Sequence, residues 1–107
     1  MKKTIRLASP IKKDDKVIDT IVLDLDKITG EDLIKAELEA RAKEPGIPHS
    51  INANSAMIHA CVASKASGLL VDDILRLSGP DFMRVTTEVS NFLFGWVLTE
   101  VDSAKSE

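Results

Sequence analysis

Apolar and polar residues alternate along residues 4–26, and this alternation limits the fold of the chain more than any other feature. Period-two spacing puts one face of a β-strand on a core and the other in water. Asp14 and Asp15 separate two such runs and tolerate turn geometry. We therefore predict an antiparallel β-hairpin or β-meander over about residues 4–26. Pro10 should lie at an edge or strand end, because proline cannot donate a ladder hydrogen bond. The predicted core positions of the two runs are Ile5, Leu7, Ile11, Ile21, Leu23 and Leu25.

The pattern changes to that of a helix after Thr29. The Thr29 side chain can cap the first free backbone N–H groups, and the acidic Asp32 lies close to the positive end of the helix dipole. Pro45 is incompatible with continued helix and pushes its predecessor out of the helical region. These signals predict a helix over about residues 30–43, followed by a loop.

A second helix is predicted over about residues 53–67. Asn52 is its expected N-cap, and Gly68 is placed to end it. Apolar residues after Gly68 then predict a short helix over about residues 71–77.

The last predicted helix runs over about residues 79–97. Ser78 provides a cap, and Asp81 follows in the first turn. Apolar residues then recur at alternating spacings of three and four, which is the seam of one continuous helix. The seam consists of Phe82, Val85, Val89, Phe92 and Trp96. We expect residues 99–107, which are mainly polar, to form a frayed tail.

This order predicts an α+β fold with an N-terminal antiparallel β-hairpin or meander and a C-terminal part of three to four helices. A chain of 107 residues fits a single domain over residues 1–107. Its net charge of −3 argues against nucleic acid as the main partner. No apolar run approaches the roughly 20 residues that span a bilayer, and no secretory signal is visible. We expect a cytoplasmic protein without a membrane partner.

The sequence offers no catalytic or cofactor-binding pattern. His59 and Cys61 are two residues apart on a predicted helix and cannot share a metal, while His49 has no further Cys or His to complete a tetrahedral site. Asp24 and Asp26 share a strand face that should be wet. We predict that the protein is not an enzyme and holds no metal or cofactor.

Residues 92–98 form an uncharged apolar segment in the last helix. With Phe92 and Trp96 on the seam, Phe94 and Leu98 lie well around the helix, beyond what a small domain easily covers. Clustered apolar residues of this kind often mark a partner surface. Two interpretations stay open: burial in the core, or an interface with a partner or a second copy. The candidate partner-binding residues are Phe92, Phe94, Trp96, Val97 and Leu98.

The order of motifs resembles the phage tail assembly chaperones of contractile-tailed phages related to P2 and Mu. Over about residues 5–94 the shared features are a strand ending in Pro-Ile, a second alternating strand, a helix opened by Thr, and a final helix that begins near an Asp and ends in Phe-Leu. They correspond here to residues 7–11, residues 18–25, Thr29 with Asp32, Asp81 with Phe82, and Phe92 with Leu93.

The resemblance implies a role in building a phage tail in the cytoplasm of a bacterial host. Such a chaperone would bind the tape measure protein before the tube polymerises, with the tail-tube protein as a second candidate partner, and would be absent from the finished particle. The alternative is a small structural tail or baseplate subunit that is retained in the particle. Homo-oligomerisation fits either role.

Overall fold

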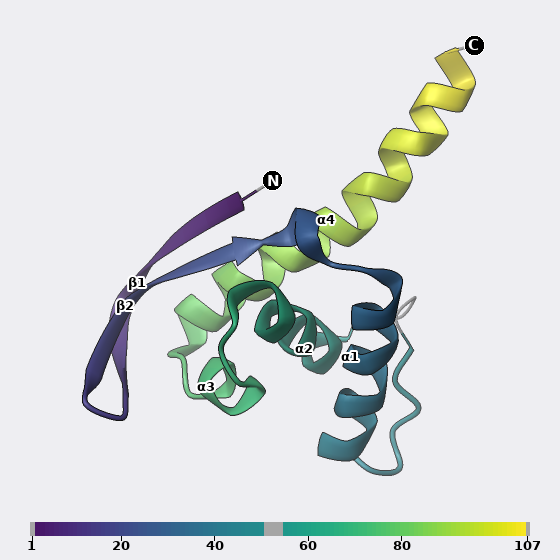
Figure 1. Cartoon of the computed structure of the whole chain (residues 1–107). Coiled ribbons are helices and arrows are strands. Elements are labelled where there is room, and N and C mark those ends of the chain that lie inside the picture. Colours follow the sequence, from purple (N-terminus) through teal and green to yellow (C-terminus); the bar gives the residue numbers. More distant parts are fainter. Residues whose placement is uncertain (1, 51–54, 107) are drawn as a thin grey trace.

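A computed structural model describes the backbone of residues 2–50 and 55–106 and the side chains of residues 2–50 and 55–95. The elements follow in the order β1 (Lys2–Lys13), β2 (Lys16–Asp24), the 3-10 turn η1 (Leu25–Lys27), α1 (Gly30–Lys43), α2 (Ala56–Ser67), α3 (Val71–Leu75) and α4 (Gly79–Ser106). Figure 1 shows the hairpin first and the helices after it. The predicted α+β class is confirmed.

The N-terminal strands form one two-stranded antiparallel sheet, so within the described residues the prediction resolves to a hairpin and not a meander. Lys13 pairs with Lys16, which leaves Asp14 and Asp15 as a two-residue turn. Asp14 has a φ of 56°, in the left-handed region that aspartate tolerates better than most residues. The regular register breaks between Arg6 and Ile11, where residues 7–10 of β1 face Asp19 of β2. Pro10 lies in this irregular stretch.

A buried aspartate at the start of α4 holds the irregular stretch of β1. The carboxylate of Asp81 accepts the backbone N–H groups of Ala8 (2.9 Å) and Ser9 (3.0 Å), and it pairs with the Arg84 guanidinium. These backbone hydrogen bonds lower the pKa of Asp81 to about 2. Ala8 and Ser9 do not pair with β2, but their N–H groups still have a partner in the fully buried carboxylate of Asp81.

A second aspartate ties the far end of the hairpin to α3. The Asp73 carboxylate accepts from Lys13 Nζ (2.5 Å), from the Arg76 guanidinium (2.9 Å) and from the Leu70 backbone N–H (3.0 Å). Lys13 is the main cause that lowers the pKa of Asp73 to about 2. Arg76, the C-cap of α3, also donates to the Lys12 carbonyl oxygen (2.8 Å), so the end of β1 is held at two neighbouring residues.

Capping fixes the ends of α1 and α2. Thr29 and Asp32 form a capping box, in which each side chain accepts the other's backbone N–H at 3.1 and 3.0 Å. Gly68 ends α2 in the left-handed conformation, as predicted. The N-cap of α2 is Ser55, whose hydroxyl accepts the Ile58 N–H, and not the expected Asn52, which lies outside the described residues.

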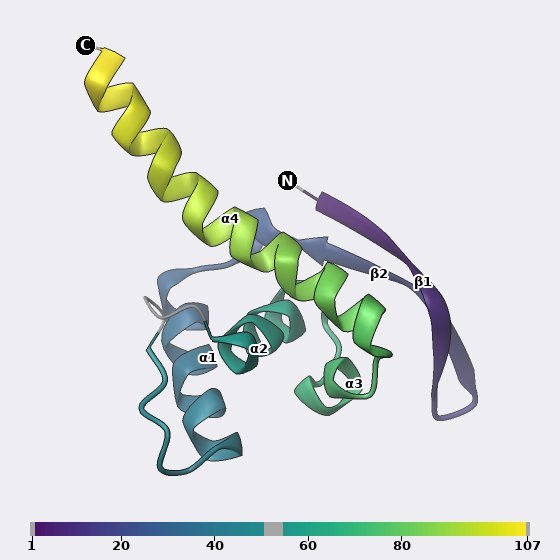
Figure 2. The ribbon, with the colours of Figure 1, turned by 180° about the vertical axis from the view of Figure 1, so that it is seen from behind.

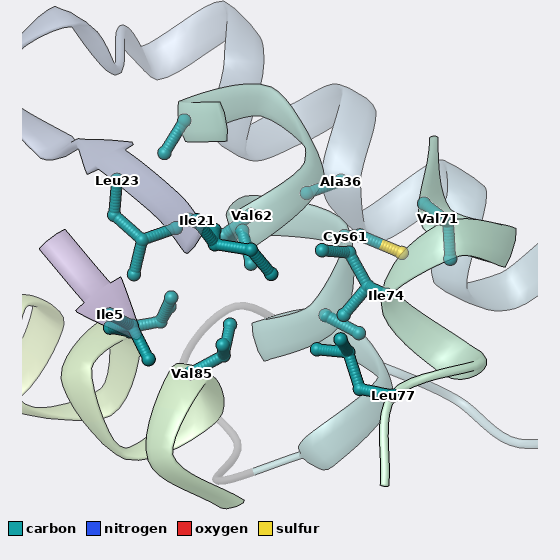
Figure 3. Packing of buried hydrophobic residues seen from close by; sticks show 14 of the residues in the cluster. Ile5, Ile21, Leu23, Ala36, Cys61, Val62, Val71, Ile74, Leu77 and Val85 are labelled. Carbon is teal, nitrogen blue, oxygen red and sulfur yellow. The ribbon is translucent and has the colours of Figure 1, made fainter. Parts of the chain in front are cut away.

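The core is centred on α2, which packs against α1, α3, α4 and β2. Its alanine, serine and cysteine side chains are small, so neighbouring elements approach it from several sides. Figure 3 shows Cys61 and Val62 of α2 among Ile21 of the hairpin and Ile74 of α3. The inward-facing strand residues and the α4 residues Val85 and Val89 are buried in the same cluster, as the alternation and the seam predicted.

The last helix is longer than expected. The structure continues α4 through Ser106, whereas the sequence predicted an end near 97 and a frayed tail over 99–107. Residues 98–106 include neither glycine nor proline, so no helix breaker ends the helix after Gly95. Figures 1 and 2 show this C-terminal part of α4 running beyond the other elements.

Candidate protein-binding surface

An apolar groove lies where α4 passes η1 and the start of α1. Its volume is about 380 Å³. The apolar lining comes from all three elements and consists of Leu25, Ile28, Leu33, Phe92 and Leu93. Among the lining residues, all within the described part of the chain, Asp26 alone is ionisable. The groove therefore fits an apolar side chain and has no set of groups for acid–base chemistry.

The wall from α1 is shaped by the way this helix begins. Leu25 of η1 is fully buried, and Ile28 and Leu33 are half-buried against the core. Ile28 precedes the N-cap Thr29, and Leu33 is the fourth residue of α1; these are the two positions of a hydrophobic staple, which sets the angle of chain entry into a helix. The capping box and the staple positions thus fix this wall of the groove.

The wall from α4 contains part of the predicted binding segment. Phe92 and Leu93 are half-buried and pack against the core. Phe94, one residue further along, is 39 % exposed. It is not among the apolar side chains that pack against the core. The side chains of Trp96, Val97 and Leu98 lie outside the described residues.

In the groove, Phe92 thus lies with residues that the sequence analysis did not name as candidate binding residues. Leu93 belongs to the apolar segment but was not singled out. Leu25 and Ile28 come from the other end of the chain, and Leu33 was assigned only to a helix. The staple spacing around Thr29 is the one local signal that pointed to Ile28 and Leu33 as a pair.

The residues considered for metal binding or catalysis have structural roles. His49 is buried, with Nε2 at 2.8 Å from Glu44 Oε1 and Nδ1 at 2.8 Å from Ser55 Oγ, so it holds the loop before α2. Burial lowers the pKa of His59 and raises the pKa of the Cys61 thiol to about 11. Over residues 2–50 and 55–95, no three His, Cys, Asp or Glu side chains gather in a way that could hold a metal ion.

The sequence matches a family model described as "Phage tail assembly chaperone proteins, E, or 41 or 14" over residues 4–93. The chain belongs to this family of phage tail assembly chaperones. The match begins in the hairpin and ends at Leu93 in the groove, so it includes every residue that lines the groove. The family resemblance is confirmed, while the narrower assignment to phages related to P2 and Mu stays a prediction.

No curated protein and no solved structure matches this tail assembly chaperone. No described helix combines the length and apolar character needed to cross a bilayer.

Proposed function

We propose that this tail assembly chaperone binds the tape measure protein during tail assembly, without catalysis, in the cytoplasm of the bacterial host. The observation that carries the proposal is the apolar groove between α1 and α4; Phe94, which is 39 % exposed, follows the groove residues Phe92 and Leu93 along α4. The tail-tube protein is a second candidate partner, and a second copy of the chain could use the same surface.

The groove suits an amphipathic helix of the partner. Its walls are two helices and a 3-10 turn whose positions are fixed by caps and core packing, so little ordering is needed on binding. One apolar side chain of the partner would fill the groove, and another would cover Phe94, which lies further around α4. The chain's net charge of −3 would help to keep the complex soluble.

Co-expression with the tape measure protein of the same genome tests the proposal. We expect affinity capture of this chain to recover soluble tape measure protein, which stays insoluble when expressed alone. A Phe94→Asp variant should lose this capture. The matched control is Leu75→Asp, because Leu75 is 40 % exposed, close to the 39 % of Phe94, but belongs to α3, which contributes no residue to the groove, whereas Phe94 follows the groove residues Phe92 and Leu93 on α4.

The alternative of a structural subunit is tested separately in purified phage particles. A chaperone should be absent from the particle, and a small tail or baseplate subunit should be present in stoichiometric amounts. Stoichiometric presence in the particle, together with failure to capture the tape measure protein, would overturn the proposed function.

A further inference from the structure

The free edge of β1 forms a second surface, separate from the groove between α1 and α4. Within the described residues the sheet has two strands, so each strand has one edge without a neighbouring strand. Such an edge presents every second backbone N–H and C=O group to a further strand. β1 also lies against α4 (Figure 2).

A groove of about 420 Å³ follows this edge between β1 and α4. Ile5 and Arg6 contribute to it from β1, and Met83 and Glu88 contribute from α4. Met83 is 61 % exposed, and its flexible thioether side chain adapts to different apolar groups. The groove therefore combines backbone groups on one side with an adaptable apolar side chain on the other.

The charge of this edge is opposite to that of the whole chain. β1 has five basic residues and no acidic residue, although the chain has a net charge of −3. Lys2, Lys3 and Arg6 are exposed, and none forms an ion pair with a residue whose side chain is described.

Unlike Lys2, Lys3 and Arg6 of β1, the basic residues of the helical part form ion pairs. The basic side chains described on α1, α2 and α4, and that of Arg76 directly after α3, all pair with carboxylates; they are Lys35, Arg41, Lys43, Lys65, Arg76 and Arg84. Among the described side chains, basic groups without an ion-pair partner are thus concentrated in the hairpin. Unpaired cations along a free strand edge favour an anionic partner over a second copy of this edge, which would repel it.

We propose that the outer edge of β1, from Lys2 to Arg6, binds an extended acidic segment of a partner protein as an added β-strand. The backbone of the segment pairs with β1, its acidic side chains meet Lys2, Lys3 and Arg6, and an apolar side chain rests on Met83. An acidic peptide is favoured over a nucleic acid because a strand edge offers backbone pairing that a nucleic acid cannot use. The surface is independent of the proposed tape measure site.

The probe is a fluorescein-labelled peptide of about ten residues that alternates glutamate and valine, titrated with the full chain and followed by anisotropy. We expect saturable binding and NMR shift changes confined to the amides of β1 residues 2–6 and the facing part of α4. Arg6→Glu should weaken binding about tenfold, which corresponds to the loss of a charge-assisted contact. The control Lys27→Glu makes the same change in net charge at a lysine that lies outside the groove between β1 and α4 and forms no ion pair with a described side chain, and it should leave binding within about twofold.

Two further probes separate strand pairing from plain charge attraction. A peptide of the same sequence with alternate backbone amides N-methylated keeps its charge and loses its donors, so it should not bind. Glu88→Gln removes the carboxylate that faces the groove and should tighten binding of the unmodified peptide. Thermal melts of Arg6→Glu, expected to match the parent protein, show that weaker binding is not unfolding.

Several results would overturn the proposal. If the peptide does not bind, the proposal is wrong, and Lys2 and Lys3 would serve only to keep the free edge of β1 from pairing with other chains. Equal binding of the N-methylated peptide, or tighter binding of a single-stranded oligonucleotide of about ten nucleotides, would replace strand addition by charge attraction or by nucleic-acid binding. Because Phe94→Asp leaves this edge intact, it should bind the acidic peptide normally, so the two proposed surfaces can fail independently.

Discussion

Truncation of Phe94 to alanine should weaken binding of the tape measure protein while it leaves the fold nearly as stable as before. Phe94 is 39 % exposed, and a phenylalanine side chain can bury about 150–250 Å². A partner could therefore cover roughly 80 Å² that the chain itself leaves open. At about 25 cal/mol per Å² this is about 2 kcal/mol, or about a 30-fold increase in Kd.

The folding cost should be much smaller than the binding cost. Phe94 is not among the side chains that pack against the core, so we expect Phe94→Ala to lower the free energy of unfolding by less than about 1 kcal/mol. Phe92→Ala should behave differently, because Phe92 packs on the core, and should lower stability as well as binding.

Isothermal titration calorimetry against a soluble fragment of the tape measure protein would measure Kd, and urea denaturation would measure stability. Leu75→Ala is the control, because Leu75 is 40 % exposed and also lies outside the core cluster, but belongs to α3, which contributes no residue to the groove, whereas Phe94 is on α4, which does. An unchanged Kd for Phe94→Ala, or the same loss for both variants, would refute the assignment of the surface around Phe94.

Three further predictions test the core and the buried polar groups. Leu23→Ala should lower the free energy of unfolding by about 2–5 kcal/mol, because Leu23 is fully buried, whereas Val22→Ala on the outer face should stay within about 1 kcal/mol in the same urea titration. Asp73 and Asp81 have pKa values of about 2, below the ordinary 3.8, so their stabilising effect is complete above about pH 5 and is lost as the pH falls through 4 toward 2. Urea midpoints from pH 7 to 2 should show this decline, and a flat profile would contradict it. Cys61 should resist a disulfide reagent at neutral pH until urea unfolds the chain, because burial raises its pKa to about 11; rapid modification of the folded protein would count against the buried position.

Local signals in the sequence were sufficient to predict the strands and helices themselves. The alternation around Ile21 and Leu23, the Thr29 cap and the Gly68 stop act within a few residues, so their spacing alone identifies two strands and the helices that follow. The predicted end of α4 near residue 97 is wrong, because the residues after Leu98 are mainly polar and polar residues do not break a helix.

The roles of two aspartates show the limit of local reasoning. The sequence explains Asp81 as a residue of a helix start, and it places Asp73 only within the short helix predicted over about residues 71–77. The fold brings Asp81 against Ala8 and Ser9, and Asp73 against Lys13, which are far away along the chain. No periodicity encodes such pairs, because it describes only which face of an element is apolar.

The same distinction holds for the binding surface. By itself the sequence determined the α+β class, the two hairpin strands, the Thr29 cap of α1, the Gly68 end of α2, and an apolar segment in the last helix that includes Phe92 and Phe94. Only the tertiary structure decided that Phe92 and Leu93 would meet Leu25 in one groove and that Phe94 would stay partly exposed. Exposure depends on which elements remain to cover a helix face, and that is fixed by packing between segments distant in the chain.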